Sequence, residues 1–275
     1  MRPTTRLIAM AALAVLVLAG VTQAGETFKQ VLPENGMTVI LEENHSSPVV
    51  NLRFYVKAGG IYEGEYLGCG ISHFCEHLVA NGPTTNRTAE EYEVEIENIG
   101  GGSNAYTTKD HTCYFIETSS EHFDKALELL ADKAMNIDFP QELVDTQQGI
   151  IVREINMGYD EPGRRIYNMF GEVMFREHET KYPVIGYVEN FERLTRDDAI
   201  KYHSNFYVPN NIVFVAVGDF DTTEAYEKIR ETFSTFERRP VEFPTLHEEP
   251  TQMGRRELRE QRDLEMAYVR VGFHT

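Results

Sequence analysis

The chain has 275 residues, a formal net charge of −18 and a hydrophobic content of 41%. That length and apolar content suffice for one large domain or two small ones with a buried core. The acidic charge excludes nucleic acid as a partner, because phosphates demand a basic surface. Three cysteines are too few for a disulfide scaffold, and a bond between Cys69 and Cys113 is left open.

The first residues are typical of an export signal. Arg2 and Arg6 precede an apolar run from Leu7 to Val21, and small residues follow it up to Ala24. A basic start, a short apolar core and a small-residue exit characterise secretory signal peptides, and the run is short for a membrane span. We therefore predict a signal peptide over residues 1–24, export to the periplasm or the medium, and no stable membrane anchor.

After this signal the pattern predicts a strand hairpin, a third strand and a helix. Residues 27–32 and 37–42 alternate as strands do, on either side of the turn signal at residues 33–36. Residues 49–56 form a third strand. The glycine-rich stretch beyond it leads into a helix over about residues 71–79.

The rest of the chain carries helices and strands in clusters. Thr88 and Glu91 form a capping box for a helix to about residue 99. Strands over 103–107 and 111–118 and a helix over 121–135 follow. A long helix is predicted from residue 140 through 154 and onward, with an interruption at Gly158 and Pro162 before a helix over 166–175. The last predicted elements are a helix over 194–206, a strand over 212–217, a helix over 221–233, a linker over 240–250 and a strand over 264–273. Such clusters favour an α+β fold, a layered antiparallel or mixed sheet with helices on one side, over strict βαβ winding.

The helix at residues 71–79 carries His73 and His77, four residues apart, with Glu76 between them. Both imidazoles lie on one helical face, so they can reach a single metal ion. Two neutral nitrogen ligands beside a proton-carrying carboxylate are typical of a hydrolytic zinc site, here in the inverted order H-x-x-E-H. Glu154, on a second predicted helix, is the candidate third ligand, whereas Cys75 should face the core. The alternative is a polar surface helix.

Several stretches in chain order resemble one known family. They are the H-x-x-E-H motif, with 76 residues between it and a glutamate, residues 101–107 with 112–114, and residues 183–186, 207–211 and 217–219. They are similar to the N-terminal part of the inverted-motif zinc metallopeptidases, which include pitrilysin, insulin-degrading and mitochondrial-processing peptidases. The resemblance runs from about residue 27 to 273. It implies the mitochondrial-processing-peptidase type of fold and a zinc endopeptidase that acts on peptides or unfolded segments.

The resemblance implies roles for the residues around the metal. His73, His77 and Glu154 would hold one Zn2+ per chain, and Glu76 would be the general base. Gln147 stands where many active members have a second glutamate, seven residues before the ligand glutamate. Its amide can hydrogen-bond a ligand but adds no charge, so we expect weaker tuning of the site.

The resemblance also implies a substrate edge and two subdomains. Asn104 and Ala105 would belong to an exposed edge strand to which a peptide substrate adds. The alternative for Asn104 is a turn residue after three glycines. Residues 25–190 would form the zinc-binding N-terminal subdomain, and residues 191–275 the incomplete start of a second one.

Members of the family have two related halves, so we expect a chain truncated at its C-terminus. A separate C-terminal half or a homologous partner subunit would then complete it. Two other functions stay open. One is a non-catalytic binding or assembly subunit, favoured by the length and by Gln147. The other is a fragment without a function of its own.

Overall fold

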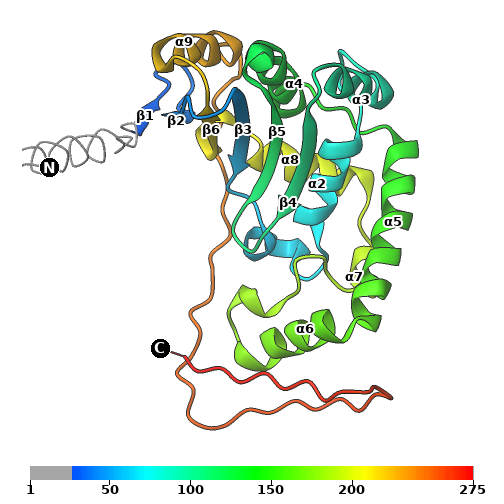
Figure 1. Cartoon of the computed structure of the whole chain (residues 1–275). Coiled ribbons are helices and arrows are strands. Elements are labelled where there is room, and N and C mark those ends of the chain that lie inside the picture. Colours follow the sequence, from blue (N-terminus) through cyan, green and yellow to red (C-terminus); the bar gives the residue numbers. More distant parts are fainter. Residues whose placement is uncertain (1–26, 275) are drawn as a thin grey trace, which may run out of the picture.

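A computed structural model describes residues 27–274, which build on a mixed six-stranded sheet (Figure 1). The predicted signal peptide lies outside these residues. The strand order is β1-β2-β6-β3-β5-β4, and every neighbouring pair is antiparallel except β2 with β6. The strands are β1 (Phe28–Val31), β2 (Thr38–Glu43), β3 (Val49–Val56), β4 (Gly102–Thr107), β5 (Thr112–Ser119) and β6 (Ile212–Gly218). The predicted α+β class with a mixed sheet is therefore confirmed.

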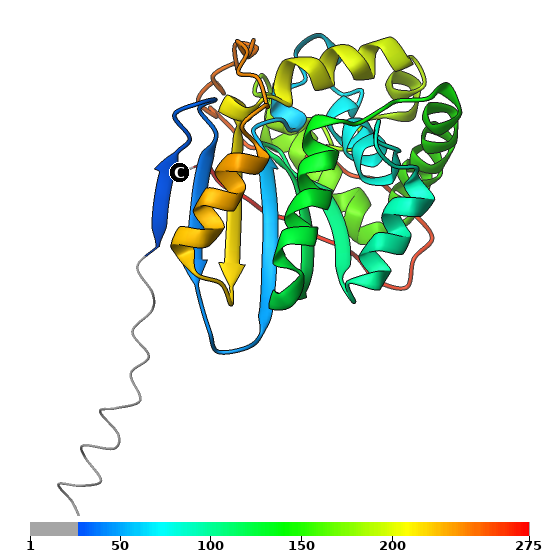
Figure 2. The same ribbon diagram turned by 90° about the horizontal axis from the view of Figure 1, so that it is seen from above.

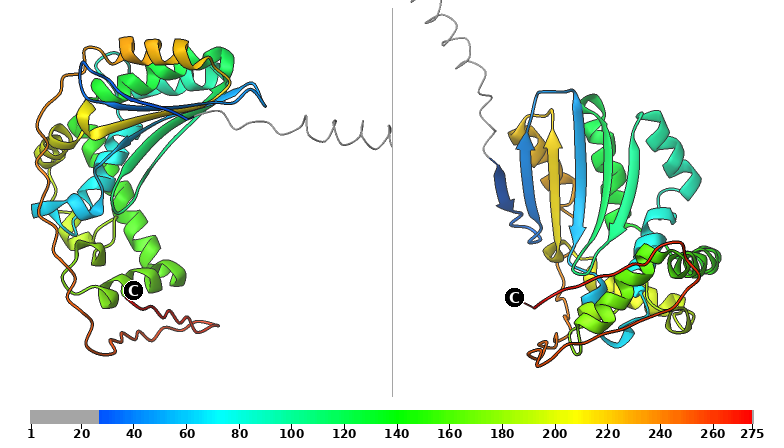
Figure 3. Two further views of the ribbon diagram at one scale, coloured as in Figure 1. Left: turned by 90° about the vertical axis from the view of Figure 1, so that its left-hand side faces the viewer. Right: turned by 60° about the horizontal axis from the view of Figure 1, so that its bottom comes forward.

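The helices carry the chain between and beyond these strands. They are α2 (Ile71–Asn81), α3 (Ala89–Asn98), α4 (Phe123–Met135), α5 (Gln141–Asp160), α6 (Pro162–Met174), α7 (Val188–Phe191), α8 (Arg196–Phe206) and α9 (Thr222–Thr232). Helices α4 and α9 lie over one face of the sheet (Figure 2; Figure 3, left). No helix among the described residues is long and apolar enough to cross a membrane.

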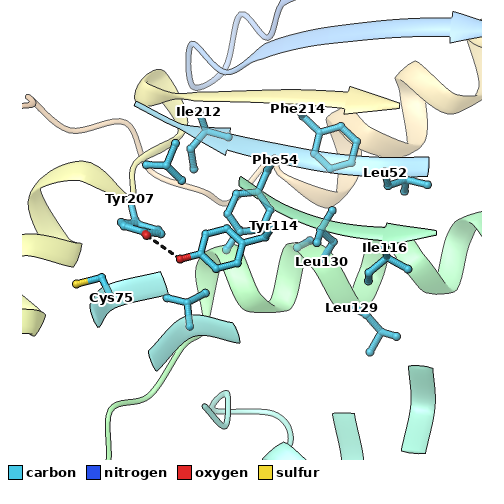
Figure 4. Packing of buried hydrophobic residues seen from close by; sticks show 14 of the residues in the cluster. Leu52, Phe54, Cys75, Tyr114, Ile116, Leu129, Leu130, Tyr207, Ile212 and Phe214 are labelled. Carbon is cyan, nitrogen blue, oxygen red and sulfur yellow. Dashed lines mark hydrogen bonds between the residues drawn. The ribbon is translucent and has the colours of Figure 1, made fainter. Parts of the chain in front are cut away.

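The core lies between this face of the sheet and the helices. Leu52 and Phe54 of β3 are fully buried, and Phe54 stacks on Tyr114 of β5 with ring centroids 4.7 Å apart (Figure 4). Tyr114 in turn shares a 2.7 Å hydrogen bond between hydroxyls with Tyr207, close to Cys75 of α2 (Figure 4). Cys75 is fully buried, as predicted. The metal-site helix is thus packed into the main core.

The three cysteines are unpaired in the structure. A bond between Cys69 and Cys113 is therefore not formed. Each thiol has its pKa raised by burial, as expected for cysteines that pack inside a protein.

Two predictions about the middle of the chain need correction. Helix α5 is not interrupted at Gly158 but continues to Asp160. Glycine weakens a helix without ending it when packing holds the turn, and Gly158 is buried. The break comes at Glu161, whose carboxylate accepts hydrogen bonds from the backbone N–H groups of the next turn and caps α6. Pro140 precedes α5 as its N-cap and is not its first helical residue.

The predicted strand over residues 264–273 is wrong. This segment follows the linker as irregular chain and passes along α6 (Figure 3, right). Alternation alone cannot make a strand, because a strand needs a neighbour to complete its backbone hydrogen bonds. Among the described residues no strand lies beside it, and Phe273 is 80% exposed. A side-chain contact holds the segment to α6 instead, because the guanidinium group of Arg270 lies 4.9 Å from the centre of the Tyr167 ring.

Candidate metal centre

Helix α2 presents His73 and His77 side by side, with ring centroids 4.5 Å apart. Buried side chains fix both ends of this helix. The carboxyl group of Glu63 accepts hydrogen bonds from the N–H groups of Gly70 and Ser72 at its start. The ammonium group of Lys133 donates to the carbonyls of Ala80 and Gly82 at its end, at 3.1 and 2.6 Å. These partners satisfy backbone groups that a helix leaves unpaired at its termini.

Glu154 of α5 completes a group of three possible ligands. Its Oε2 lies 3.8 Å from Nε2 of His73 and 3.7 Å from Nε2 of His77. The three potential ligand atoms all lie within 4.8 Å of one another. In a tetrahedral zinc site with bonds of about 2.0–2.1 Å, neighbouring ligand atoms stand roughly 3.3 Å apart. The donor set of two imidazoles and a carboxylate therefore fits zinc with little rearrangement.

The protonation state of His73 also suits a metal ligand. Burial, with a smaller effect from neighbouring His77, lowers the pKa of His73 to about 3. The imidazole is therefore neutral at physiological pH and offers a lone pair. Its Nδ1 is buried and has no hydrogen-bond partner within residues 27–274.

Gln147, about two turns before Glu154 on α5, contacts the other histidine. Its Oε1 lies 3.0 Å from Nδ1 of His77. An amide oxygen only accepts, so this contact makes Nδ1 the donor and directs the Nε2 lone pair toward Glu154. The structure thus places Gln147 where an orienting partner of a metal ligand belongs.

Replacing Gln147 with alanine is expected to weaken zinc binding about 10- to 100-fold, the usual effect of losing a residue that orients a ligand. The reason is that His77 loses the hydrogen bond that orients its ring, while all three candidate ligand atoms remain. Competition with a fluorescent zinc chelator measures this affinity. The exposed Gln141 on the same helix is a matched control as Gln141→Ala, and equal affinities for both variants would contradict this role.

Glu76 points to the same place without belonging to the ligand group. It is 8% exposed, and burial raises the pKa of its carboxyl group, while a hydrogen bond from Thr107 opposes that rise. Oγ1 of Thr107 donates to Oε2 of Glu76 at 2.7 Å. Oγ1 of Thr107 also lies 3.3 Å from that of Thr112, which donates to the carbonyl of Ala58. This chain of hydroxyls fixes the rotamer of Glu76.

The function of Thr107 was not predicted from the sequence. The residue appeared there only as part of the strand beside the motif. The signal that could have indicated it is a hydroxyl residue at the end of the strand after the motif. Because α2 packs on β4, that hydroxyl lies within reach of the motif helix.

Asn104 and Ala105 lie on β4, which is one of the two edge strands of the sheet as described, at the opposite edge from β1. Asn104 is exposed, and its Oδ1 accepts the N–H of Ala105. Asn104 therefore sits within a strand and not in a turn. One edge of β4 pairs with β5, and no strand among the described residues pairs with the other edge, so the backbone groups of that edge can bind another strand.

Models of two families match the chain. The one described as "Insulinase (Peptidase family M16)" matches residues 38–187, and "Peptidase M16 inactive domain" matches residues 193–275. An uncharacterized zinc protease of Bacillus subtilis is 26% identical over 249 residues, which cover 89% of this chain and 58% of that protein. A probable mitochondrial-processing peptidase subunit beta of Arabidopsis thaliana is 28% identical over 255 residues, or 92% and 48% of the two chains.

A solved structure with a similar fold is also a protease. The crystal structure of a protease from Helicobacter pylori matches with a TM-score of 0.78 and 28% identity, over 84% of this chain and 56% of that one. The resemblance inferred from the motifs is confirmed, as is the predicted type of fold. The chain spans about half the length of the curated relatives it matches.

Proposed function

The chain belongs to the insulinase family of peptidases, family M16, and we propose that it is a zinc-dependent endopeptidase of peptides or unfolded segments. The observation that carries the proposal is the meeting of His73, His77 and Glu154 from two helices, with Glu76 beside them. Such a set, with three protein ligands and a free carboxylate, is the composition of hydrolytic zinc sites. One Zn2+ per chain follows from one such group.

The side chains around the site have separate tasks in hydrolysis. Bound zinc would make a coordinated water acidic and polarise the scissile carbonyl. Glu76 would take the proton from that water and deliver it to the departing amine. Its raised pKa favours this exchange, because a carboxylate that is not too acidic holds a proton long enough to pass it on. Thr107 would keep the carboxylate of Glu76 aimed at the water.

The free edge of β4 supports a peptide substrate. An extended peptide that adds to this edge gains backbone hydrogen bonds, which are independent of its sequence. Asn104 and Ala105 would contact it directly, next to the general base. This arrangement favours unfolded chains, because a folded protein cannot offer an extended strand to the edge.

We also propose the larger organisation that the family implies. Residues 25–190 would form the zinc-binding subdomain and residues 191–275 the start of a second one. A C-terminal half or a homologous subunit would act as partner, since the matched residues cover only 58% and 48% of these two relatives. Residues 1–24 would direct the protein out of the cytoplasm, to the periplasm or the medium.

The purified chain is expected to hold about one zinc per molecule and to cleave an unfolded peptide substrate. A chelator should stop cleavage and added zinc should restore it, because without the metal no group at the site activates the attacking water. Elemental analysis and a quenched fluorescent peptide measure the two properties. Cleavage that resists complete zinc removal would contradict the proposal. Zinc binding without cleavage, even after a C-terminal half is supplied, would favour the non-catalytic subunit.

A further inference from the structure

A pocket of about 330 Å³ opens directly beside Glu76 and His77. It lies between α2, α3, β4 and α4, which meet at this corner of the fold (Figure 1). Its volume is at the lower end of the range of about 300–1,000 Å³ typical of pockets that bind small groups. The side chains of Ala80, Ala89 and Ala105 leave the space open. We call it the α2–α3 pocket.

The position of the pocket matches one residue of a bound peptide. Thr107, at one end of β4, contacts Glu76, whereas Ser103 to Ala105 line the pocket. A strand added antiparallel to β4 runs from the Thr107 end toward the Gly102 end. The residue just after the scissile bond therefore comes to lie over the pocket. Alternate side chains of such a strand point to the face where Ala105 pairs with Tyr114, and both residues line the pocket.

The charges in the pocket differ in whether they are already paired. Lys133 is 3% exposed, donates to two carbonyls at the end of α2 and lies 4.2 Å from the centre of the Tyr92 ring. Burial also lowers the pKa of Lys133 to about 8. Its charge is thus engaged by α2 and Tyr92.

Glu93 is the opposite case. It is exposed on α3 and lines the pocket, and within residues 27–274 its carboxylate makes no hydrogen bond or ion pair. Among the described side chains that line the pocket, it is the ionised group with neither a hydrogen bond nor an ion pair, although its charge acts on Lys133 and partly opposes the fall in the pKa of that ammonium group. A cation entering the pocket would pair with it, and an anion would meet both carboxylates.

We propose that the α2–α3 pocket binds the side chain of the residue just after the scissile bond and selects lysine or arginine through Glu93. The inference rests on the proposed peptidase function and adds a substrate class to it. The alanine walls accept the aliphatic stem of such a side chain, and Glu93 at the wall binds its charged end. Peptides with a basic residue at that position are then cleaved in preference to neutral ones.

Three peptides that differ only after the scissile bond test the pocket. They carry lysine, its uncharged analogue norleucine, or glutamate. We expect a kcat/KM for the lysine peptide about tenfold above that for norleucine, the usual effect of one charged hydrogen bond. Glu93→Gln should remove this difference, and Glu93→Lys should reverse it in favour of glutamate. Glu97→Gln, an exposed glutamate on the same helix and outside the pocket, should keep the preference of the parent.

The outcomes separate this inference from the proposed function. Cleavage of all three peptides with equal kcat/KM would overturn the pocket assignment and leave the peptidase intact. If no peptide is cleaved, even after a C-terminal half is supplied, the peptidase proposal fails, and the pocket is then tested by binding. In that experiment, fluorescence anisotropy of labelled peptides on the zinc-loaded protein should show tighter binding of lysine than of norleucine. Equal affinities would overturn the pocket assignment.

Discussion

Replacing Glu76 with glutamine is expected to lower kcat by a factor of about 100 to 10,000, the usual contribution of a general base, while zinc stays bound. An amide has the shape of the carboxylate but cannot take a proton from water at neutral pH. The three candidate ligand atoms belong to His73, His77 and Glu154, so metal binding should not depend on Glu76. A quenched fluorescent peptide gives kcat, and elemental analysis gives the zinc content.

The variant should also fold as the parent does. The hydroxyl of Thr107 can donate to the amide oxygen in the same position. Burial disfavours the ionised carboxylate of Glu76, so a neutral amide should not lower Tm. Glu97→Gln serves as a matched control because it removes a charge far from these contacts. A Glu76→Gln protein that cleaves like the parent would show that the base is elsewhere. Loss of zinc would show that Glu76 is itself a ligand.

Local signals in the sequence were enough for most elements of this fold. The capping box at Thr88 and Glu91 forms as predicted and begins α3. The turn at residues 33–36 joins β1 to β2, and Asn35 secures it by binding the distant carbonyl of Phe233 at 2.8 Å. The hydrogen bonds of caps and turns join residues only a few positions apart, so a short stretch of sequence is enough to predict them.

The order of the strands could not be obtained in this way. β6 inserts between β2 and β3, although about 150 residues of chain separate it from them. Its apolar run, IVFVAVG, predicted a buried strand but not its neighbours. The segment at residues 264–273 shows that a strand-like pattern can also be present where no strand forms. Its alternation was a true pattern, yet a strand forms only where another strand can pair with it.

The same distinction applies to the site. The spacing of His73, Glu76 and His77 determines a common helical face, and Glu154 followed from its helical context and from the family resemblance. The partners of these residues were not visible. Thr107 reaches Glu76 only because β4 packs on α2. Such contacts depend on how distant elements meet, which one sequence does not reveal.

Replacing Glu154 with alanine is expected to weaken zinc binding more than about 100-fold, beyond the loss typical of residues that only orient a ligand. Two histidines on one helix remain, and they satisfy half of a tetrahedral shell. Thermal unfolding with and without zinc measures the effect. Zinc at 100 times the Kd of the parent stabilises it by about 2.7 kcal/mol, which raises Tm by roughly 5–11 °C in a domain of this size.

The same zinc concentration should shift the Tm of Glu154→Ala by no more than about 2 °C, because it then only equals or falls below Kd. The variant without metal should melt near the temperature of the metal-free parent. Glu154 is one-third exposed, and its carboxylate also pairs with Arg164, which lies 3.8 Å away on the surface. Glu142→Ala, an exposed glutamate in the first turn of α5, is the matched control and should keep the full zinc-dependent shift. A full shift in Glu154→Ala would mean that another residue is the third ligand, and the pairing of α5 with α2 would then serve the fold alone.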